Sequence, residues 1–270
     1  MIIVPPYSPI LSGITSGTFA IPLLPWTLSP VGLALTDLGS VRAMFTNVRK
    51  KAYGYVITHY LPHVTSAAAL VASDLNILEG AILTDIHTAT TSWHPTPPAN
   101  PTDAVLTRIA VGIQLWGGNA GRGAFVQDGG FSANFNPAAY RQMIAELKKS
   151  VPAGAAGMQC PNLQNAVNIW TGRGFNQFGV SFATKHFCFW SKAVGMPNQL
   201  PIYDNIIAKI AMGHRQANWG HYWNYVNAMR SEVANINAAN PHFGSLYTIS
   251  QLERQLFNWA NSPAAAYWNR

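Results

Sequence analysis

Residues 179–192 have the sequence Gly-Val-Ser-Phe-Ala-Thr-Lys-His-Phe-Cys-Phe-Trp-Ser-Lys, and this stretch decides the fold class of the chain. A glycine turn leads into apolar and aromatic side chains that predict a helix from Val180 to Val194. A Gly/Pro loop follows over 195–201, and Asp204 then begins another helical pattern. The sequence contains no convincing alternating run of strand length. We therefore predict an all-α protein.

The remaining helices are predicted from apolar periodicity and from the residues that begin and end them. They cover about 36–60, 65–88, 102–115, 136–150, 162–170, 204–211, 214–236 and 250–260. Residues 1–35, which prolines interrupt repeatedly, are predicted to form an irregular arm. Residues 94–101, His-Pro-Thr-Pro-Pro-Ala-Asn-Pro, are the clearest linker. Chain order then predicts two helical lobes: 100–204, and a discontinuous lobe of 1–99 with 205–270.

The charge balance favours a polyanionic partner. The chain has 17 Lys and Arg against 10 Asp and Glu, which gives a net charge of +7. Binding of such a protein to nucleic acid releases counterions from the phosphates and thereby favours association. A basic protein that binds nothing acidic is the alternative.

The sequence offers little support for a metal, disulfide or membrane protein. Two cysteines, Cys160 and Cys188, cannot hold a four-thiolate cluster or build a disulfide framework. His59 and His63 have helical spacing, but a proline lies between them, so we expect no metal. Residues 1–35 lack the Lys or Arg of a signal peptide and are broken by prolines. We therefore expect a cytoplasmic protein without a membrane span.

Lys185 and Asp204 are the residues best suited to carry chemistry. A lysine on an otherwise apolar helix is desolvated, which favours its neutral, nucleophilic form. A carboxylate nearby can take a proton from it and stabilise developing positive charge. Together they suit reaction at a sugar anomeric carbon, where the transition state resembles an oxocarbenium ion. The structural alternatives are a core lysine that extends its amine toward solvent and an aspartate that only caps a helix.

This pair resembles the helix–hairpin–helix DNA glycosylase superfamily, particularly its 8-oxoguanine branch. In that family a hairpin precedes Thr-Lys on a helix, and an aspartate follows nineteen residues after the lysine. Thr184-Lys185 and Asp204 have the same separation. The resemblance covers about 100–215 and implies a two-lobed helical fold with a DNA-binding cleft. It further implies that Lys185 is the nucleophile and that Asp204 stabilises the positive charge.

A glycine-rich loop carries a second resemblance. Residues 116–122, Trp-Gly-Gly-Asn-Ala-Gly-Arg, have the Asn-x-x-Arg spacing of a loop that enters DNA in the 8-oxoguanine enzymes. The resemblance implies that Asn119 fills the space left by a flipped base and that Arg122 contacts the orphaned partner base. The alternative is an ordinary helix exit.

The hairpin itself departs from the family pattern Leu-Pro-Gly-Val-Gly. Residues 181–183, Ser-Phe-Ala, occupy the last three of those positions, and Gly179 lies two residues earlier. The resemblance implies DNA contacts at Gly179 and Ser181, but it does not carry over the family's phosphate-binding hairpin and its cation. We also expect four side chains to line the base pocket, with core packing as the alternative for the phenylalanines: Phe189, Gln251, Gln255 and Phe257.

The implied activity is excision of a modified base by base flipping, with AP-lyase activity through a lysine Schiff base. The expected partner is double-stranded DNA, the protein is expected to be a monomer, and no metal or organic cofactor is needed. The substrate is either an oxidised purine in repair or a hypermodified base of phage DNA in antiviral defence, such as glucosylated hydroxymethylcytosine. Two rivals remain: a non-catalytic DNA-binding protein with a glycosylase-like fold, and an enzyme on small nucleosides.

Overall fold

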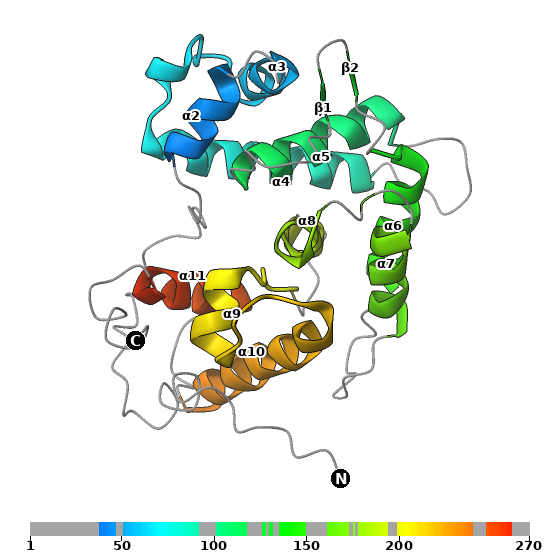
Figure 1. The fold of residues 1–270 in the computed structure, drawn as a ribbon, viewed down its shortest axis with the longest axis vertical. Coiled ribbons are helices and arrows are strands. Elements are labelled where there is room, and N and C mark those ends of the chain that lie inside the picture. Colours follow the sequence, from blue (N-terminus) through cyan, green and yellow to red (C-terminus); the bar gives the residue numbers. More distant parts are fainter. Residues whose placement is uncertain are drawn as a thin grey trace. The chain divides into compact units, whose positions relative to one another are not determined.

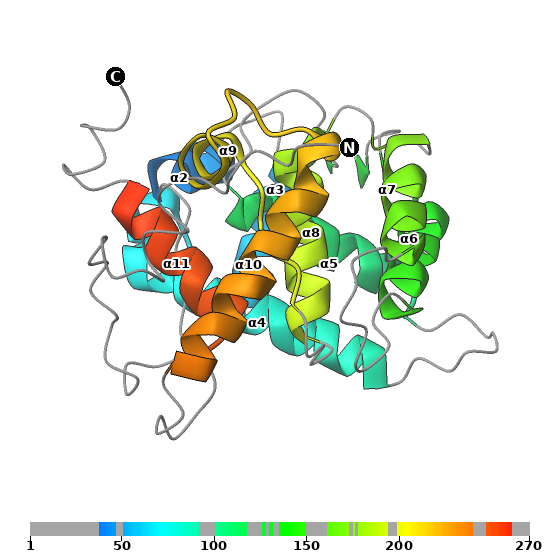
Figure 2. The same ribbon diagram turned by 90° about the horizontal axis from the view of Figure 1, so that it is seen from below.

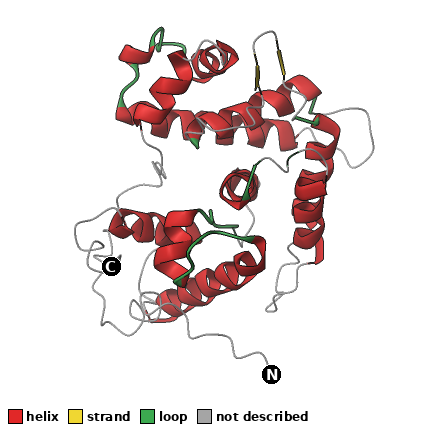
Figure 3. Cartoon of the chain, viewed as in Figure 1, coloured by secondary structure: helices red, strands yellow, loops and turns green. Residues whose placement is uncertain are grey.

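The computed structural model is helical, as predicted (Figure 1, Figure 3). It describes residues 38–46, 51–91, 101–117, 126–127, 130–131, 135–149, 161–172, 175, 178–193, 199–239 and 247–260. Within these ranges the one sheet is a pair of two-residue antiparallel strands, β1 (Val126–Gln127) and β2 (Gly130–Phe131). In the same ranges, no helix combines the length and apolar character needed to cross a lipid bilayer.

The helices lie close to the predicted ranges. They are α2 (Leu38–Thr46), α3 (Lys51–Tyr60), the 3₁₀ turn η2 (Ala67–Ala69), α4 (Ala72–Thr91), α5 (Asp103–Trp116), α6 (Pro137–Lys149), α7 (Pro161–Gly172), α8 (Val180–Ala193), α9 (Asn205–Met212), α10 (Trp219–Ala239) and α11 (Ile249–Ala260).

Three features of the helices differ from the prediction, and local capping explains two of them. The single helix expected over 36–60 is two helices, α2 and α3. Helix α4 begins at Ala72 because the Asp74 carboxylate accepts the backbone N–H of Val71, 2.8 Å away, and so caps that end. Helix α10 begins at Trp219 because the side-chain carbonyl of Asn218 accepts the backbone N–H of His221.

The contacts divide the chain into two compact units, whose described parts are α2 to α8 and α9 to α11. We had expected 1–99 to pack with 205–270 and the boundary to lie near residue 100. Instead α4 packs on α5 and α8, and α3 packs on α5, so helices on both sides of the Pro-rich segment 92–100 share one core. Prolines mark where a helix ends, whereas a domain boundary depends on which apolar faces meet.

A partly buried polar contact joins three helices of the first unit. Arg108 on α5 donates to both carboxylate oxygens of Asp85 on α4, at 2.8 and 2.9 Å. The Tyr60 hydroxyl at the end of α3 donates to the same carboxylate at 2.9 Å. Burial and the charge of Asp85 raise the pKa of Tyr60, so the phenol keeps its proton and remains a donor. The contact therefore fixes the position of the Tyr60 ring against α5.

Gly112 is the point on α5 where this packing is closest. A β-carbon on Gly112 would lie 2.8 Å from Cε2 of Tyr60 and 3.2 Å from Cγ1 of Ile82. Because the Tyr60 ring is held by Asp85, it cannot retreat without losing that hydrogen bond. We expect Gly112→Ala to lower the free energy of unfolding by about 1–3 kcal/mol despite its better helix propensity.

Urea unfolding of the full chain tests this expectation, and Gly80→Ala is its matched control. Gly80 lies on the exposed face of α4, and a β-carbon there would meet nothing within 4 Å. That variant should gain about 0.5–1 kcal/mol. Equal effects of the two substitutions would show that Tyr60 and Ile82 can move away from a β-carbon at position 112 without a loss of stability.

Candidate active site

Lys185 lies on a helix that is buried on nearly every side. Helix α8 packs against α4, α5 and α6, and Lys185 is only 8% exposed. Its Nζ lies 4.5 Å from the centroid of the Phe182 ring, one turn earlier on the same helix. That geometry is a cation–π contact between the amine and a half-buried aromatic face. The predicted nucleophile is therefore shielded from bulk water.

The stem of Lys185 runs along Gly117, where α5 ends. A β-carbon on Gly117 would lie 3.0 Å from Cδ of Lys185 and 3.3 Å from Cε1 of Phe182. Glycine at this position therefore permits the close approach of the lysine stem to the backbone. Gly117 is also where the glycine-rich loop leaves the helix, so the loop starts beside the amine. Asn119 and Arg122, the predicted DNA contacts of this loop, lie outside the described residues.

A buried hydrogen-bond chain follows Lys185 on α8. Nε1 of Trp190 donates to the Tyr140 hydroxyl at 2.8 Å, and that hydroxyl lies 2.7 Å from Nδ1 of His186. Since the Tyr140 oxygen accepts from Trp190, its own proton points to His186, which assigns the imidazole proton to Nε2. Burial and the charge of Lys185 lower the pKa of His186 to about 3. The imidazole therefore stays neutral beside the lysine.

The neutral His186 predicts a specific loss of stability in acid. In the unfolded chain His186 takes up a proton near its ordinary pKa of 6.5, whereas in the folded chain it does so only near 3. The contribution of His186 to the free energy of unfolding is therefore fully present above pH 6.5 and is lost as the pH drops toward 3. At pH 5.0 this one group should already cost about 2 kcal/mol.

The variant His186→Gln isolates that contribution, because its amide oxygen can still accept the Tyr140 proton but does not titrate. Urea unfolding at pH 7.5 and pH 5.0 should show a drop that is about 2 kcal/mol smaller in the variant than in the parent. Carboxylates contribute equally to both proteins and cancel in this difference. Identical drops would mean that His186 is protonated in the folded protein.

Lys192, the other lysine of α8, has a structural partner. Its Nζ lies 2.6 Å from Oε1 of Glu79 on α4, and the Glu79 side chain is buried. The ion pair links α4 to α8 and keeps the Lys192 amine engaged with a carboxylate. Of these two lysines, Lys185 is the one that the structure places beside the glycine-rich loop.

Asp204 belongs to the second unit, where it caps α9. Its Oδ1 accepts the backbone N–H of Ile207 at 2.8 Å, which is the N-cap role that we weighed as an alternative. Among the described residues Oδ2 makes no hydrogen bond, and the side chain is half-exposed. Asp204 can therefore cap the helix with one oxygen and present the other to a ligand.

The residues before Asp204 are anchored to α10 and α11. The Glu253 carboxylate accepts the backbone N–H of Ile202 at 2.5 Å, and the Tyr222 hydroxyl donates to the Pro201 carbonyl at 3.1 Å. The Tyr203 ring stacks on that of Tyr225 with centroids 4.8 Å apart. These contacts hold the chain firmly as it enters α9, and so position Asp204.

The other predicted site residues have mixed placements. Phe189 is buried against Trp116, with ring centroids 4.9 Å apart, so it has the core role rather than a base contact. The side-chain oxygen of Gln251 accepts from both the backbone N–H and the hydroxyl of Thr248, which is a capping box at the start of α11. Phe257 is half-buried on the same helix. Gln255 is also on α11, but its side chain lies outside the described residues.

Gly179 and Ser181 stand at the start of α8. The Gly179 carbonyl accepts the backbone N–H groups of Phe182 and Ala183, at 3.0 and 3.2 Å, so Gly179 is the N-cap position. It is exposed, and Ser181 is half-buried in the first turn. The turn between α7 and α8 is tied by Nε1 of Trp170, which donates to the Phe178 carbonyl at 2.9 Å.

Sequence reasoning missed two features of these sites. The chain from Trp190 through Tyr140 to His186 joins residues 46 or more positions apart, and no local pattern marks it. The capping box at Thr248 and Gln251 does have a local signal, Thr-x-x-Gln before an apolar run. That signal identifies Gln251 as a helix-capping residue.

No family model matches the chain, and no curated protein or solved structure shows significant similarity to it. Metal binding likewise has no candidate in the described part of the chain, where no three His, Cys, Asp or Glu side chains form a group. Nε2 of His63 and Oδ1 of Asp74 lie 3.0 Å apart and form a hydrogen bond.

Proposed function

We propose that this protein is a DNA glycosylase that uses Lys185 as its nucleophile. The observation that carries the proposal is the setting of Lys185: a buried amine on an aromatic-rich helix, lying against the residue where the glycine-rich loop begins. An amine shielded from water is a better nucleophile than an exposed one. A glycine-rich sequence that begins beside this amine suits an element that enters DNA while the target base is flipped out.

The chemistry follows from the two groups. The Lys185 ammonium first gives its proton to the Asp204 carboxylate. The resulting amine attacks C1′ of the flipped nucleotide, the bond from C1′ to the base nitrogen breaks, and the base leaves with that electron pair and takes the proton from Asp204. The sugar ring then opens as a proton moves from the amine nitrogen to the ring oxygen, which gives a Schiff base. Removal of a C2′ proton by a base forms the C2′–C3′ double bond and expels the 3′ phosphate. Asp204 offers its carboxylate to the positive charge that develops at C1′. No step requires a metal or an organic cofactor.

The proposal places two demands on the protein. Lys185 lies in the first unit and Asp204 in the second, and the mechanism requires that both reach the same sugar. The Lys185 amine must also be uncovered, and Phe182 is the half-buried side chain that lies over it. The net charge of +7 attracts the protein to DNA phosphates, and this attraction favours the binding on which both requirements depend.

Borohydride trapping of the protein on a panel of duplexes is the test. The panel contains an oxidised purine, glucosylated hydroxymethylcytosine, an abasic site and unmodified DNA, each at the same salt concentration. A glycosylase with AP-lyase activity gives a covalent complex with at least one modified duplex and with the abasic site. Absence of any trapped complex, together with salt-dependent duplex binding, would favour the non-catalytic DNA-binding protein instead.

A further inference from the structure

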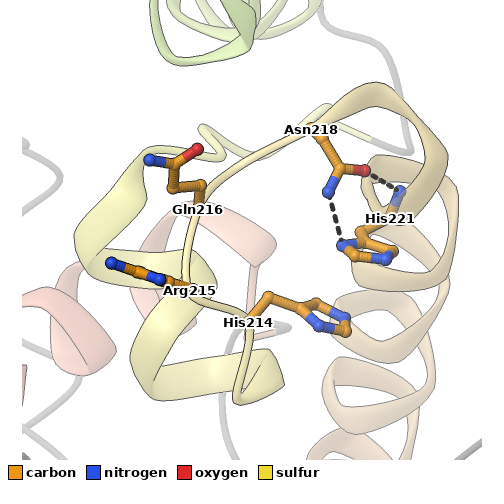
Figure 4. Close-up of a pocket in the computed structure, with 5 residues that line it drawn as sticks. All are labelled: His214, Arg215, Gln216, Asn218 and His221. Carbon is orange, nitrogen blue, oxygen red and sulfur yellow. Dashed lines mark hydrogen bonds between the residues drawn. The ribbon is translucent and has the colours of Figure 1, made fainter.

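A pocket of about 320 Å³ opens on the second unit, at the loop between α9 and α10 (Figure 4). It is lined by His214, Arg215, Gln216, Asn218 and His221. Neither the cap of α9 at Asp204 nor any residue of α8 contributes to this lining. No acidic side chain is among the residues that line it. The pocket is thus rich in hydrogen-bond donors and free of carboxylates.

The loop that forms the pocket is held at three points. At its start, Gly213 adopts φ 68°, and the backbone N–H of His214 donates to the Ala208 carbonyl at 3.0 Å, which closes α9. In its middle, the backbone N–H of Ala217 donates to the Asn205 side chain at 3.0 Å. At its end, Asn218 caps α10. A loop fixed in this way loses little conformational freedom when it binds a ligand.

Two imidazoles form one wall of the pocket. The rings of His214 and His221 stack with centroids 3.6 Å apart and planes 16° from parallel. The Asn218 amide donates to Nδ1 of His221 at 2.8 Å, which leaves the imidazole proton on Nε2 as a donor. Burial and the charge of His221 lower the pKa of His214. Two stacked rings of this kind repel each other when both are charged, unless an anion lies beside them.

Arg215 and Gln216 extend on the other side of the loop (Figure 4). Arg215 is exposed, and its guanidinium carries five N–H donors in a planar fork that matches the oxygens of a phosphate. The backbone at the start of α10 is already capped by Asn218, so the side chains themselves supply the donors for a ligand.

We propose that this pocket binds a phosphate group. A phosphate offers only acceptors and carries negative charge. The lining presents imidazole donors on one side of the loop and guanidinium and amide donors on the other, and it contains no carboxylate. The site is separate from Lys185 and does not rest on the glycosylase activity. The phosphate can belong to a nucleic-acid backbone or be a free phosphate, because both present the same oxygens.

Titration of the full chain with inorganic phosphate at pH 7.0, followed through the backbone amide resonances of residues 213–221, tests the site. The parent protein should show saturable shifts. Arg215→Gln should weaken binding at least tenfold, and His214→Phe should do the same while it keeps a ring stacked on His221. Lys209→Gln is the matched control, because Lys209 is an exposed cation of α9 outside the pocket lining. It should bind phosphate like the parent.

A second titration with an unmodified duplex distinguishes the two sources. If the pocket binds a backbone phosphate, Arg215→Gln should weaken duplex binding and reduce its salt slope by about one, whereas Lys209→Gln should do so less. Unchanged duplex binding with lost phosphate binding assigns the site to free phosphate. No saturable shifts in the parent, or equal effects of Arg215→Gln and Lys209→Gln on phosphate binding, would overturn the proposal. Lys185→Gln should leave phosphate binding intact, so failure of the glycosylase does not affect this result.

Discussion

Replacing Lys185 by glutamine should abolish borohydride trapping while leaving duplex binding nearly intact. Glutamine is shorter, uncharged and not nucleophilic, so no covalent bond to C1′ can form. Its stem still fits beside Gly117, and His186 is neutral, so it loses no charge partner. The fold should therefore survive. The measurement is the yield of trapped complex on the duplex that the parent protein traps best, with affinity measured on the same duplex.

Lys192→Gln is the control for that experiment. It removes a cation from the same helix, but one that pairs with Glu79 at 2.6 Å. We expect lower thermal stability, because a buried carboxylate loses its partner, and undiminished trapping at a temperature where the variant is folded. If Lys185→Gln still traps and Lys192→Gln does not, the nucleophile is Lys192 and the assignment of Lys185 is wrong.

Much of the helical architecture can be predicted from local sequence, because apolar periodicity and capping residues are local signals. Asn136 illustrates this: Asn-Pro is a local signal for a helix start, and the Asn136 side chain accepts the backbone N–H of Ala139 at 3.0 Å. Leu75, Leu78 and Ile82 recur at helical spacing in the sequence, and all three are buried on α4. For such residues the period of the helix alone determines which side chains turn inward.

The grouping of helices could not be predicted in this way. The Pro-rich segment 94–101 predicts a domain boundary, yet α4 and α5 on either side of it pack together, and Arg108 on α5 donates to Asp85 on α4. Which helices meet depends on the fit of whole side-chain surfaces, and that information is spread over distant residues. The side-by-side packing of α6 and α7, visible in both views, is of the same kind (Figure 1, Figure 2).

In the candidate site, too, contacts between distant residues could not be predicted from local sequence. The pattern around Lys185 identified a desolvated lysine, and the side chain is indeed buried. The Gly117 contact and the Tyr140–His186 hydrogen bond depend on the packing of α8 against α5 and α6, which sequence spacing does not contain. Conversely, the side chains of Phe189 and Gln251 are of types suited to a base pocket, but Phe189 packs in the core and Gln251 caps α11.

Asp204→Asn should slow base release about 10²–10³-fold in single-turnover measurements and leave stability almost unchanged. Asparagine caps a helix about as well as aspartate, so the hydrogen bond to the Ile207 N–H can be kept. What the variant loses is the negative charge that stabilises the transition state, and one such group is usually worth that factor.

Asp204→Ala separates the two roles, because it removes both the cap and the charge. It should show the same rate loss as Asp204→Asn and, in addition, a loss of about 1 kcal/mol in the free energy of unfolding. If Asp204→Asn keeps the parental rate while Asp204→Ala is destabilised, the carboxylate only caps α9. The base-excision mechanism would then need another group to stabilise the charge at C1′, and the nineteen-residue separation from Lys185 would carry no chemical meaning.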